Sequence, residues 1–171
     1  LFGSRRVLED ADGIICVGCT EYAAVRERFP AKPVFHVPNG VDADRFSQAD
    51  GALFRQAHGF AASERIVLCV SRIDYQKNQL GLLRAFARFA AEHPDHRLVL
   101  IGPVTAGAYY DEVAVEVQQM GMAEKVRIIE GLHPADPMLP SAYKAAELFA
   151  LPSLHEPFGI VVLEAWAAGL P

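Results

Sequence analysis

Two carboxylates near the end of the chain have the residue type and spacing of a ligand site. Glu156 and Glu164 are separated by seven residues, most of them apolar. The apolar run that begins after Gly159 predicts a helix that is hydrophobic on every side and therefore buried. Because a glutamate is almost never buried without a partner, Glu164 is expected to face a cleft where a ligand hydrogen-bonds it. Glu156 precedes the predicted helix start, where free backbone N–H groups attract anions. A ligand that carries both hydroxyls and phosphates fits these two positions.

The glutamate pair has two other interpretations. Glu156 and Glu164 could be the general acid and base of a glycoside hydrolase. They could also be structural, with Glu156 capping the helix and Glu164 meeting a buried arginine. A single charge in an otherwise apolar helix favours a functional Glu164, and the preference for a functional Glu156 is smaller.

Two basic side chains form a second candidate site. Arg72 and Lys77 lie in the loop that follows the apolar segment 66–70, which predicts a buried strand. Two cations in one loop would neutralise a diphosphate, and an arginine can bind two of its oxygens at once. The alternative is a solvated turn between a strand and a helix. The two glutamates downstream favour the phosphate site.

The rest of the sequence predicts the elements that position these side chains. Short apolar segments predict strands at residues 14–17, 34–37, 66–70, 98–101, 126–129 and 148–151. Other segments predict helices at residues 3–11, 21–28, 78–92, 108–121 and 141–146, and after Gly159. Apolar strands that alternate with helices indicate an α/β fold, a Rossmann-like parallel sheet with helices on both faces. Such sheets bind ligands at the carboxyl ends of their strands, where Arg72 and Glu156 would lie.

Composition excludes several classes of protein. Of the 171 residues, 51% are hydrophobic, which is enough for a large core. A net charge of −5 argues against a nucleic-acid binder, and no apolar run approaches the length of a transmembrane segment. The three cysteines, Cys16, Cys19 and Cys69, are interpreted as buried thiols of a protein from the reducing cytoplasm.

No metal site is expected from the sequence. Cys16 and Cys19 form a C-x-x-C motif, but they flank a strand end and lack the second pair that a zinc site would need. D-x-D motifs at residues 10–12 and 42–44 do not follow a predicted strand and are interpreted as turns. The G-x-G-x-x-G fingerprint is absent, which disfavours a nicotinamide-dependent dehydrogenase.

Four segments, taken in order, resemble the family 4 retaining glycosyltransferases, which have the GT-B fold. They are residues 37–42 with Phe46, residues 71–78 with an Arg-x4-Lys pattern, residues 98–103, and residues 156–171 with an E-x7-E pattern. The resemblance implies the C-terminal, donor-binding half of a GT-B fold, truncated at both ends. The implied parts are the tail of the N-terminal domain (1–45), an interdomain connection (46–63) and a nucleotide-sugar-binding domain that is incomplete at its C-terminus (64–171).

The resemblance also implies which residues are catalytic. Arg72 and Lys77 would grip the diphosphate of a nucleotide sugar and stabilise the negative charge that develops as it leaves. Glu156 would hold hydroxyls of the donor sugar close to the anomeric carbon. These three are the expected catalytic residues, and no residue is assigned as a nucleophile.

Other implied contacts go to the phosphates and the ribose. The backbone N–H groups of Phe158, Gly159 and Ile160 would stabilise the diphosphate from the helix start. Glu164 would bind the ribose hydroxyls. All four residues belong to the E-x7-E segment, so the resemblance places most of the donor site there.

The implied reaction is transfer of a hexosyl group from a nucleotide-diphosphate sugar, with retention of configuration and without a metal or cofactor. A UDP-sugar is favoured, and Leu132 and His133 stand where the family usually contacts the base. A sugar or lipid-linked acceptor would bind the missing N-terminal domain, so the fragment alone is expected to be inactive. A lipid-linked acceptor would place the whole protein peripherally at a membrane.

Two alternatives stay open within this fold. The chain could be a nucleotide-sugar-binding module without catalysis, or a GT-B epimerase that acts on a sugar nucleotide. The combination of Arg-x4-Lys with E-x7-E disfavours the epimerase. It also disfavours a phosphorylase, which would need a lysine site for pyridoxal phosphate. An intact upstream domain would distinguish a transferase from a binding module.

Overall fold

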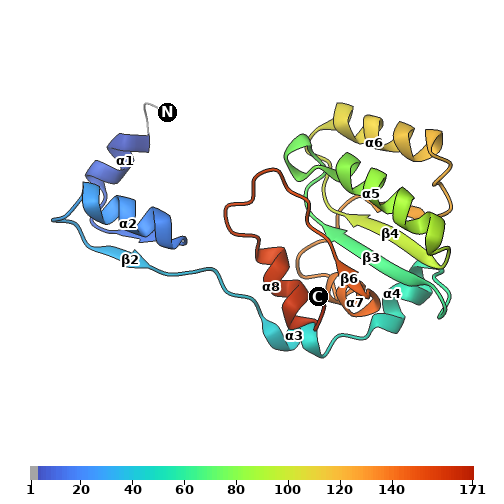
Figure 1. The fold of residues 1–171 in the computed structure, drawn as a ribbon. Helices are drawn as coiled ribbons and strands as arrows, with labels where there is room; N and C mark the ends of the chain where they lie inside the picture. Colours follow the sequence, from blue (N-terminus) through green and yellow to red (C-terminus); the bar gives the residue numbers. More distant parts are fainter. Residues whose placement is uncertain (1–3) are drawn as a thin grey trace. The chain divides into compact units, whose positions relative to one another are not determined.

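The chain divides into two units after Gly40. The computed structural model describes residues 4–171. In the first unit, helix α1 (Ser4–Asp10), strand β1 (Ile14–Cys16), helix α2 (Cys19–Arg28) and strand β2 (Val34–His36) follow one another, and β1 pairs with β2 in parallel (Figure 1).

The cysteines of the first unit differ in their exposure. Cys16 is buried in β1, as expected, whereas Cys19 is exposed, with its Sγ 3.7 Å from Nε2 of His36. The prediction of a buried thiol is therefore wrong for Cys19. The reason is its place in the first turn of α2, a helix in which none of the described residues is buried.

The second unit contains the predicted parallel sheet. Its elements are α3 (Ala43–Ser47), α4 (Gly51–His58), β3 (Arg65–Val70), the short 3-10 helix η1 (Tyr75–Lys77), α5 (Gln79–Glu92), β4 (His96–Ile101), α6 (Gly107–Gln119), β5 (Val126–Ile129), α7 (Met138–Ala145), β6 (Leu148–Phe149) and α8 (Ile160–Ala167). The four strands lie in the order β5-β4-β3-β6, and all neighbouring pairs are parallel. Within residues 4–171, no helix combines the length and apolar character needed to cross a bilayer.

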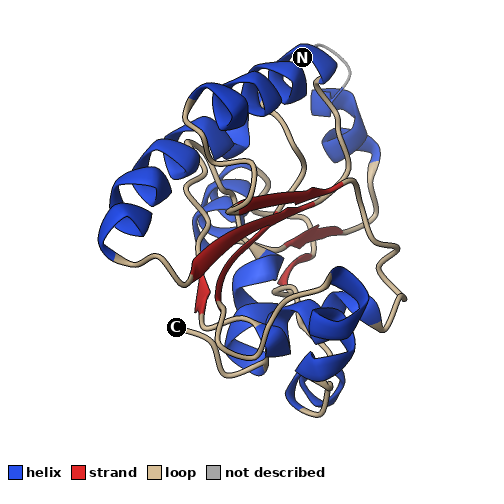
Figure 2. Cartoon of the chain, turned by 90° about the vertical axis from the view of Figure 1, so that its right-hand side faces the viewer, coloured by secondary structure: helices blue, strands red, loops and turns tan. Residues whose placement is uncertain are grey.

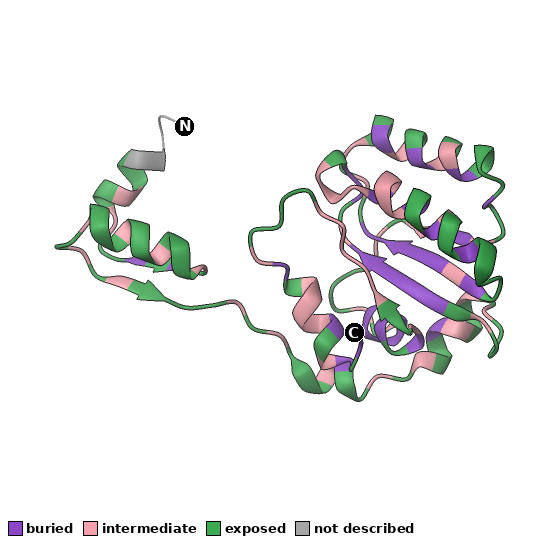
Figure 3. Ribbon diagram, in the orientation of Figure 1, coloured by how far each residue is buried: buried purple, intermediate pink, exposed green. Residues whose placement is uncertain are grey.

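Helices cover both faces of this sheet (Figure 2). Ile66, Leu68 and Val70 of β3 belong to one core cluster, which includes residues of α3, α4, α7 and α8. Val67 and Cys69 alternate with them and pack on the other side with residues of α5 and α6. Strands β3 and β4 are buried while the outer surfaces of the helices are exposed (Figure 3). The continuous apolar strands of the sequence therefore correspond to a sheet buried on both faces.

The connections from β3 and β6 leave the sheet in opposite directions. The chain runs from β3 into α5, which packs on one face, and from β6 towards α8, which packs on the other. Because β3 and β6 are neighbours, their following loops diverge at the carboxyl edge of the sheet. Such a switch point is the usual ligand site of an open α/β sheet.

The stretch 46–63, expected as an interdomain connection, is part of the second unit. It holds the end of α3 and all of α4, whose Phe46 and Phe54 are buried in the core. The observed division after Gly40 also differs from the expected boundary at residue 45. The cause is two short helices whose few apolar side chains are enough to anchor them against α7 and α8.

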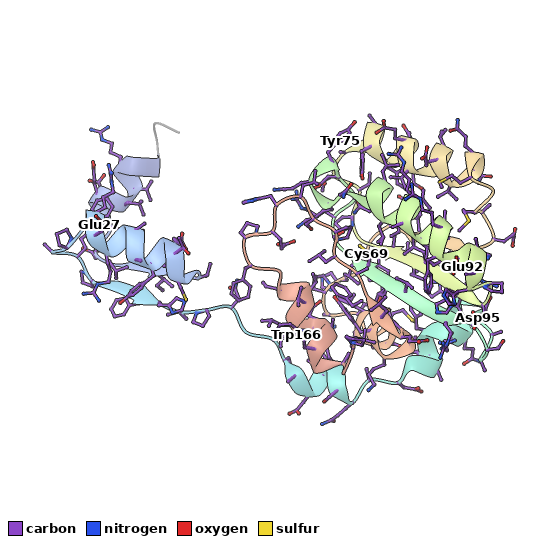
Figure 4. The ribbon with its side chains drawn as sticks, in the orientation of Figure 1. Glu27, Cys69, Tyr75, Glu92, Asp95 and Trp166 are labelled. Carbon is purple, nitrogen blue, oxygen red and sulfur yellow. The ribbon has the colours of Figure 1, made fainter. Side chains whose placement is uncertain are left out.

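The helix α8 is not buried on every side, contrary to the prediction. Among its residues Ala165 is buried, whereas Trp166 is 65% exposed and Ile160 is 43% exposed. Figure 4 labels Trp166 on this helix. Contacts with α3 and α7 cover one side of the helix. The sequence shows which side chains of the helix are apolar, and its contacts with neighbouring helices determine which of them are buried.

Candidate functional site

The loop after β3 is organised by the buried carboxylate of Asp74. One oxygen accepts hydrogen bonds from the backbone N–H groups of Gln76 (3.0 Å) and Lys77 (3.2 Å), which starts the turn η1. The other oxygen accepts from the Thr105 hydroxyl (3.2 Å) and pairs with the Arg72 guanidinium (3.2 Å). Asp74 therefore holds the Arg72 guanidinium and the backbone of Lys77, the two residues that the sequence assigned to a phosphate site.

The other side of this loop rests against the end of β4. The buried Gln79 donates hydrogen bonds to the Ser71 hydroxyl (3.0 Å) and to the Arg72 carbonyl (2.7 Å). A Cβ atom on Gly102 would come within 1.8 Å of the Ser71 carbonyl oxygen. The close approach of two backbones at Gly102 therefore sets the position of the Arg72 loop.

Lys77 and Glu156, which the sequence assigned to one ligand site, form an ion pair. Lys77 Nζ is 2.6 Å from Glu156 Oε2, and the Ser153 hydroxyl donates to the same oxygen at 3.2 Å. Desolvation alone would raise the pKa of Glu156. The hydrogen bonds and charge of Lys77, with hydrogen bonds from Ser153 and the Gly159 backbone, outweigh it and lower the pKa. Glu156 is thus held as a carboxylate beside a cation.

Two hydrogen bonds join the loop after β6 to the segment after β3. The Leu154 N–H donates to the Gln76 carbonyl at 2.8 Å, and the Asn78 side chain donates to the Pro152 carbonyl at 3.3 Å. The two loops that diverge at the switch point are therefore one connected structure, with Lys77 and Glu156 between them.

The start of α8 has the predicted open N-terminus. Gly159, with φ of +74°, is the N-cap and supplies no side-chain cap. Its carbonyl accepts from the Val162 N–H at 2.8 Å, and its own N–H contributes to holding Glu156. Phe158 is half-buried and Ile160 is exposed. The glycine turn therefore aims the helix start at the carboxylate of Glu156.

Glu164 meets a tyrosine instead of the arginine of the structural alternative. The Tyr143 hydroxyl donates to Glu164 Oε2 at 2.6 Å. Burial, the charge of Glu164 and this hydrogen bond raise the pKa of Tyr143 far above its usual value, so the phenol stays a donor. Within the described part of the chain, no interaction joins Glu164 to Arg72, Lys77 or Glu156.

Leu132 and His133 follow β5 at the same edge of the sheet. Leu132 is half-buried against the core. His133 is exposed, and its ring Nδ1 accepts a hydrogen bond from the Ala135 N–H at 3.1 Å. The structure places both residues in one turn, which Asp136 closes with its N–H to the His133 carbonyl (2.8 Å).

The assembled groups suit an anionic ligand that also carries hydroxyls. Arg72 keeps half of its side-chain surface exposed, so its guanidinium remains accessible. Among residues 4–171 there is no cluster of three or more metal-ligating side chains. A hollow of about 410 Å³ lined by residues of α3, α4 and α7 shares no side chain with this site. The second unit is thus a Rossmann-like domain in which Arg72, Lys77 and Glu156 lie at the switch point of the sheet.

The chain belongs to the family described as glycosyl transferases group 1, whose family model matches residues 51–171. A D-inositol 3-phosphate glycosyltransferase of Segniliparus rotundus is 31% identical over all of this chain and 38% of its own length. A GDP-mannose-dependent α-(1-6)-phosphatidylinositol monomannoside mannosyltransferase of Mycolicibacterium smegmatis is 32% identical, over 98% of this chain and 45% of its own. The chain thus spans less than half the length of these relatives.

Solved structures show the same fold. HepE of Anabaena, determined with UDP and glucose, has a TM-score of 0.80 at 25% identity and covers 98% of this chain and 45% of its own. A sucrose-phosphate synthase of Thermosynechococcus elongatus has a TM-score of 0.76 at 28% identity, over 98% of this chain and 41% of its own. These neighbours confirm the GT-B relationship and the α/β fold that the sequence predicted.

Sequence reasoning gave no role to Asp74 or Tyr143. Asp74 could have been recognised from the sequence, because an aspartate directly before a turn of helix is a typical N-cap. No sequence pattern identifies Tyr143, because its hydrogen bond to Glu164 joins two helices and residues 21 positions apart. Asp74 contacts Arg72 and Tyr143 contacts Glu164, and both partners were identified from the sequence.

The substitution Asp74→Asn tests the control of Arg72. An asparagine keeps an oxygen for the two backbone N–H groups but loses the ion pair with the guanidinium. We expect the fold to persist and the affinity for a nucleoside diphosphate to fall roughly three- to tenfold, because Arg72 must then be ordered on binding. Calorimetry on the chain measures this, with Asp111→Asn at an exposed position of α6 as the control. Equal affinities in the two variants would contradict the role of Asp74.

Proposed function

We propose that the protein transfers a hexosyl group from a nucleotide-diphosphate sugar to an acceptor with retention of configuration, and that this chain binds the donor. The observation that carries the proposal is the junction of Lys77 and Glu156 at the switch point of the sheet. It brings a cation for the diphosphate beside a carboxylate for the sugar. Membership of the group 1 glycosyltransferases supports the reaction type.

Arg72 and Lys77 would hold the diphosphate and stabilise the negative charge that grows on it as the glycosidic bond breaks. The backbone N–H groups of Phe158 and Ile160 would add to that stabilisation, and so would that of Gly159 once the diphosphate takes the place of Glu156 on it. Because two side-chain cations offset the charge of the leaving diphosphate, we propose that the reaction proceeds without a metal ion or other cofactor.

Glu156 would accept hydrogen bonds from hydroxyls of the donor sugar. The 2.6 Å pair with Lys77 connects the sugar position to the phosphate position, and the incoming diphosphate would share Lys77 with Glu156. Glu164 would accept hydrogen bonds from the ribose hydroxyls. Leu132 and His133 would contact the base from the turn after β5.

The nucleotide that we propose is UDP. HepE, a structural neighbour of this chain, was determined with UDP and glucose, which supports this choice. The Mycolicibacterium smegmatis relative uses GDP-mannose by its name, so GDP is the competing nucleotide in the test. The acceptor would be a sugar or a lipid-linked molecule bound outside this chain. We place the reaction in the cytoplasm, in line with the unpaired state of the cysteines.

Transfer by a protein that contains this chain tests the proposal. The donor is UDP-glucose or GDP-mannose, transfer is measured with and without EDTA, and proton NMR of the product reports the anomeric configuration. We expect transfer that EDTA leaves unchanged and a product with the anomeric configuration of the donor. A product of inverted configuration, or activity that EDTA removes and a divalent cation restores, would contradict the proposal.

A further inference from the structure

Tyr143 is built into the core more firmly than the glutamate it contacts. The residue is 0% exposed, and its ring packs edge-on against Phe46 (centroids 5.3 Å apart) and at a tilt of 31° against Phe149 (5.7 Å). It stands on α7, in which Leu139 through Tyr143 are all buried. The hydroxyl therefore has a fixed position that does not depend on a ligand.

Glu164 stands on a less constrained element. Ala165 is the one buried residue within α8, and Trp166 lies exposed two positions beyond Glu164. In the described part of the chain, the Tyr143 hydroxyl is the one group that hydrogen-bonds the Glu164 carboxylate, through Oε2. The second oxygen, Oε1, is left to accept other hydrogen bonds. The direction of this carboxylate is thus set from the core by a single short bond.

We propose that Tyr143 is a positioning residue for nucleotide binding. Its buried hydroxyl holds one oxygen of Glu164, so that the other is presented to the ribose hydroxyls. This inference rests on the proposed function, which gives Glu164 the ribose. A carboxylate fixed before binding loses less rotamer freedom when the ligand arrives, and it selects for a ligand that has the matching hydroxyls.

The test measures selectivity for the ribose as well as affinity. Calorimetry on the 171-residue chain compares UDP, GDP and ADP with their 2′-deoxy and 3′-deoxy forms. For the unaltered chain we expect the loss of a bound hydroxyl to weaken binding about tenfold or more. In Tyr143→Phe, which keeps the ring contacts, we expect the parent nucleotide to bind roughly tenfold more weakly and the penalty for a missing hydroxyl to fall to about twofold.

A matched tyrosine and a double substitution separate positioning from a general structural effect. Tyr109 is also buried and accepts a hydrogen bond from the Leu80 N–H, but it does not contact Glu164. Tyr109→Phe is expected to keep the full ribose selectivity, and urea unfolding confirms that each variant is folded. In a Glu164→Ala background, Tyr143→Phe should change the affinity no further, because its effect acts through that carboxylate.

Three outcomes would overturn the inference. Two of them would also overturn part of the proposed function. A folded Tyr143→Phe chain that keeps the full ribose selectivity overturns the inference alone. An unaltered chain that binds a nucleoside diphosphate but ignores both ribose hydroxyls also overturns the assignment of Glu164. An unaltered, folded chain that binds none of UDP, GDP and ADP overturns donor binding itself, and the role of Tyr143 with it.

Discussion

Replacing Arg72 with alanine is expected to lower glycosyl transfer by about a hundredfold or more in a protein that contains this chain. The guanidinium would stabilise charge that appears as the donor bond breaks, and removing one such group typically has an effect of this size. Affinity for the nucleoside diphosphate should fall by roughly ten- to a hundredfold, since a charge-assisted hydrogen bond is lost. Initial rates at saturating donor and calorimetry measure the two effects.

Arg84→Ala is the matched control for this prediction. Arg84 is also a half-exposed arginine with an acidic partner, Glu116 at 2.8 Å, but it lies on α5 outside the site. We expect transfer to be unchanged and stability to change by less than about 0.5 kcal/mol. If Arg72→Ala retained the activity of Arg84→Ala, the diphosphate site would lie elsewhere.

Gly102→Ala is expected to have the largest effect on stability and to disable the site as well. The new Cβ would lie 1.8 Å from the Ser71 carbonyl oxygen, a backbone atom that cannot move aside as a side chain can. Relief requires the loop after β3 to leave the end of β4, which would displace Arg72. We expect a loss of about 3 kcal/mol or more in the free energy of unfolding, measured with urea, together with a loss of nucleotide binding.

Gly107→Ala provides the control for the glycine substitution. Gly107 begins α6, and a Cβ there meets no heavy atom within 4 Å. We expect no loss of stability, or a gain of up to about 1 kcal/mol, because alanine favours the helix and restricts the unfolded chain. A Gly102→Ala chain as stable as Gly107→Ala would refute the close approach at Ser71.

The strands of the second unit were readily predictable from the sequence. Residues 66–70 and 98–101 are apolar without interruption, and a strand buried on both faces has this pattern. Residues 126–129 are apolar apart from the exposed Arg127. Their boundaries agree with the structure to within two residues. Helix α7 was predicted less completely, as residues 141–146. The helix already begins at Met138, with Pro137 as its N-cap and Pro140 in its first turn, where a proline is tolerated.

Which apolar side chains are buried was less predictable than where the helices and strands lie. The stretch 46–63 is polar overall, yet Phe46 and Phe54 alone bury α3 and α4 in the core. The run after Gly159 is apolar all round, yet Trp166 is largely exposed. In both segments the sequence shows which side chains are apolar, and contacts with residues distant in the chain determine which of them are covered.

The charged residues of the candidate site could be named from the sequence, because their types and spacing form recognisable patterns. Arg72, Lys77 and Glu156 were named from the sequence, and the structure joins Lys77 to Glu156 across 79 positions of the chain. The supporting residues were not predictable in the same way. Asp74 and Tyr143 are common residue types whose roles depend on which atoms they reach in three dimensions.

Binding of nucleoside diphosphates to the 171-residue chain tests the central claim most directly. Calorimetry would compare UDP, GDP and ADP on the unaltered chain and on the Arg72→Ala and Glu164→Ala variants, with urea unfolding to confirm that each chain is folded. The account predicts that one nucleotide binds and that both substitutions weaken it at least roughly tenfold. Binding that neither substitution alters, or a folded chain that binds none of the three, would contradict a donor site at this edge of the sheet.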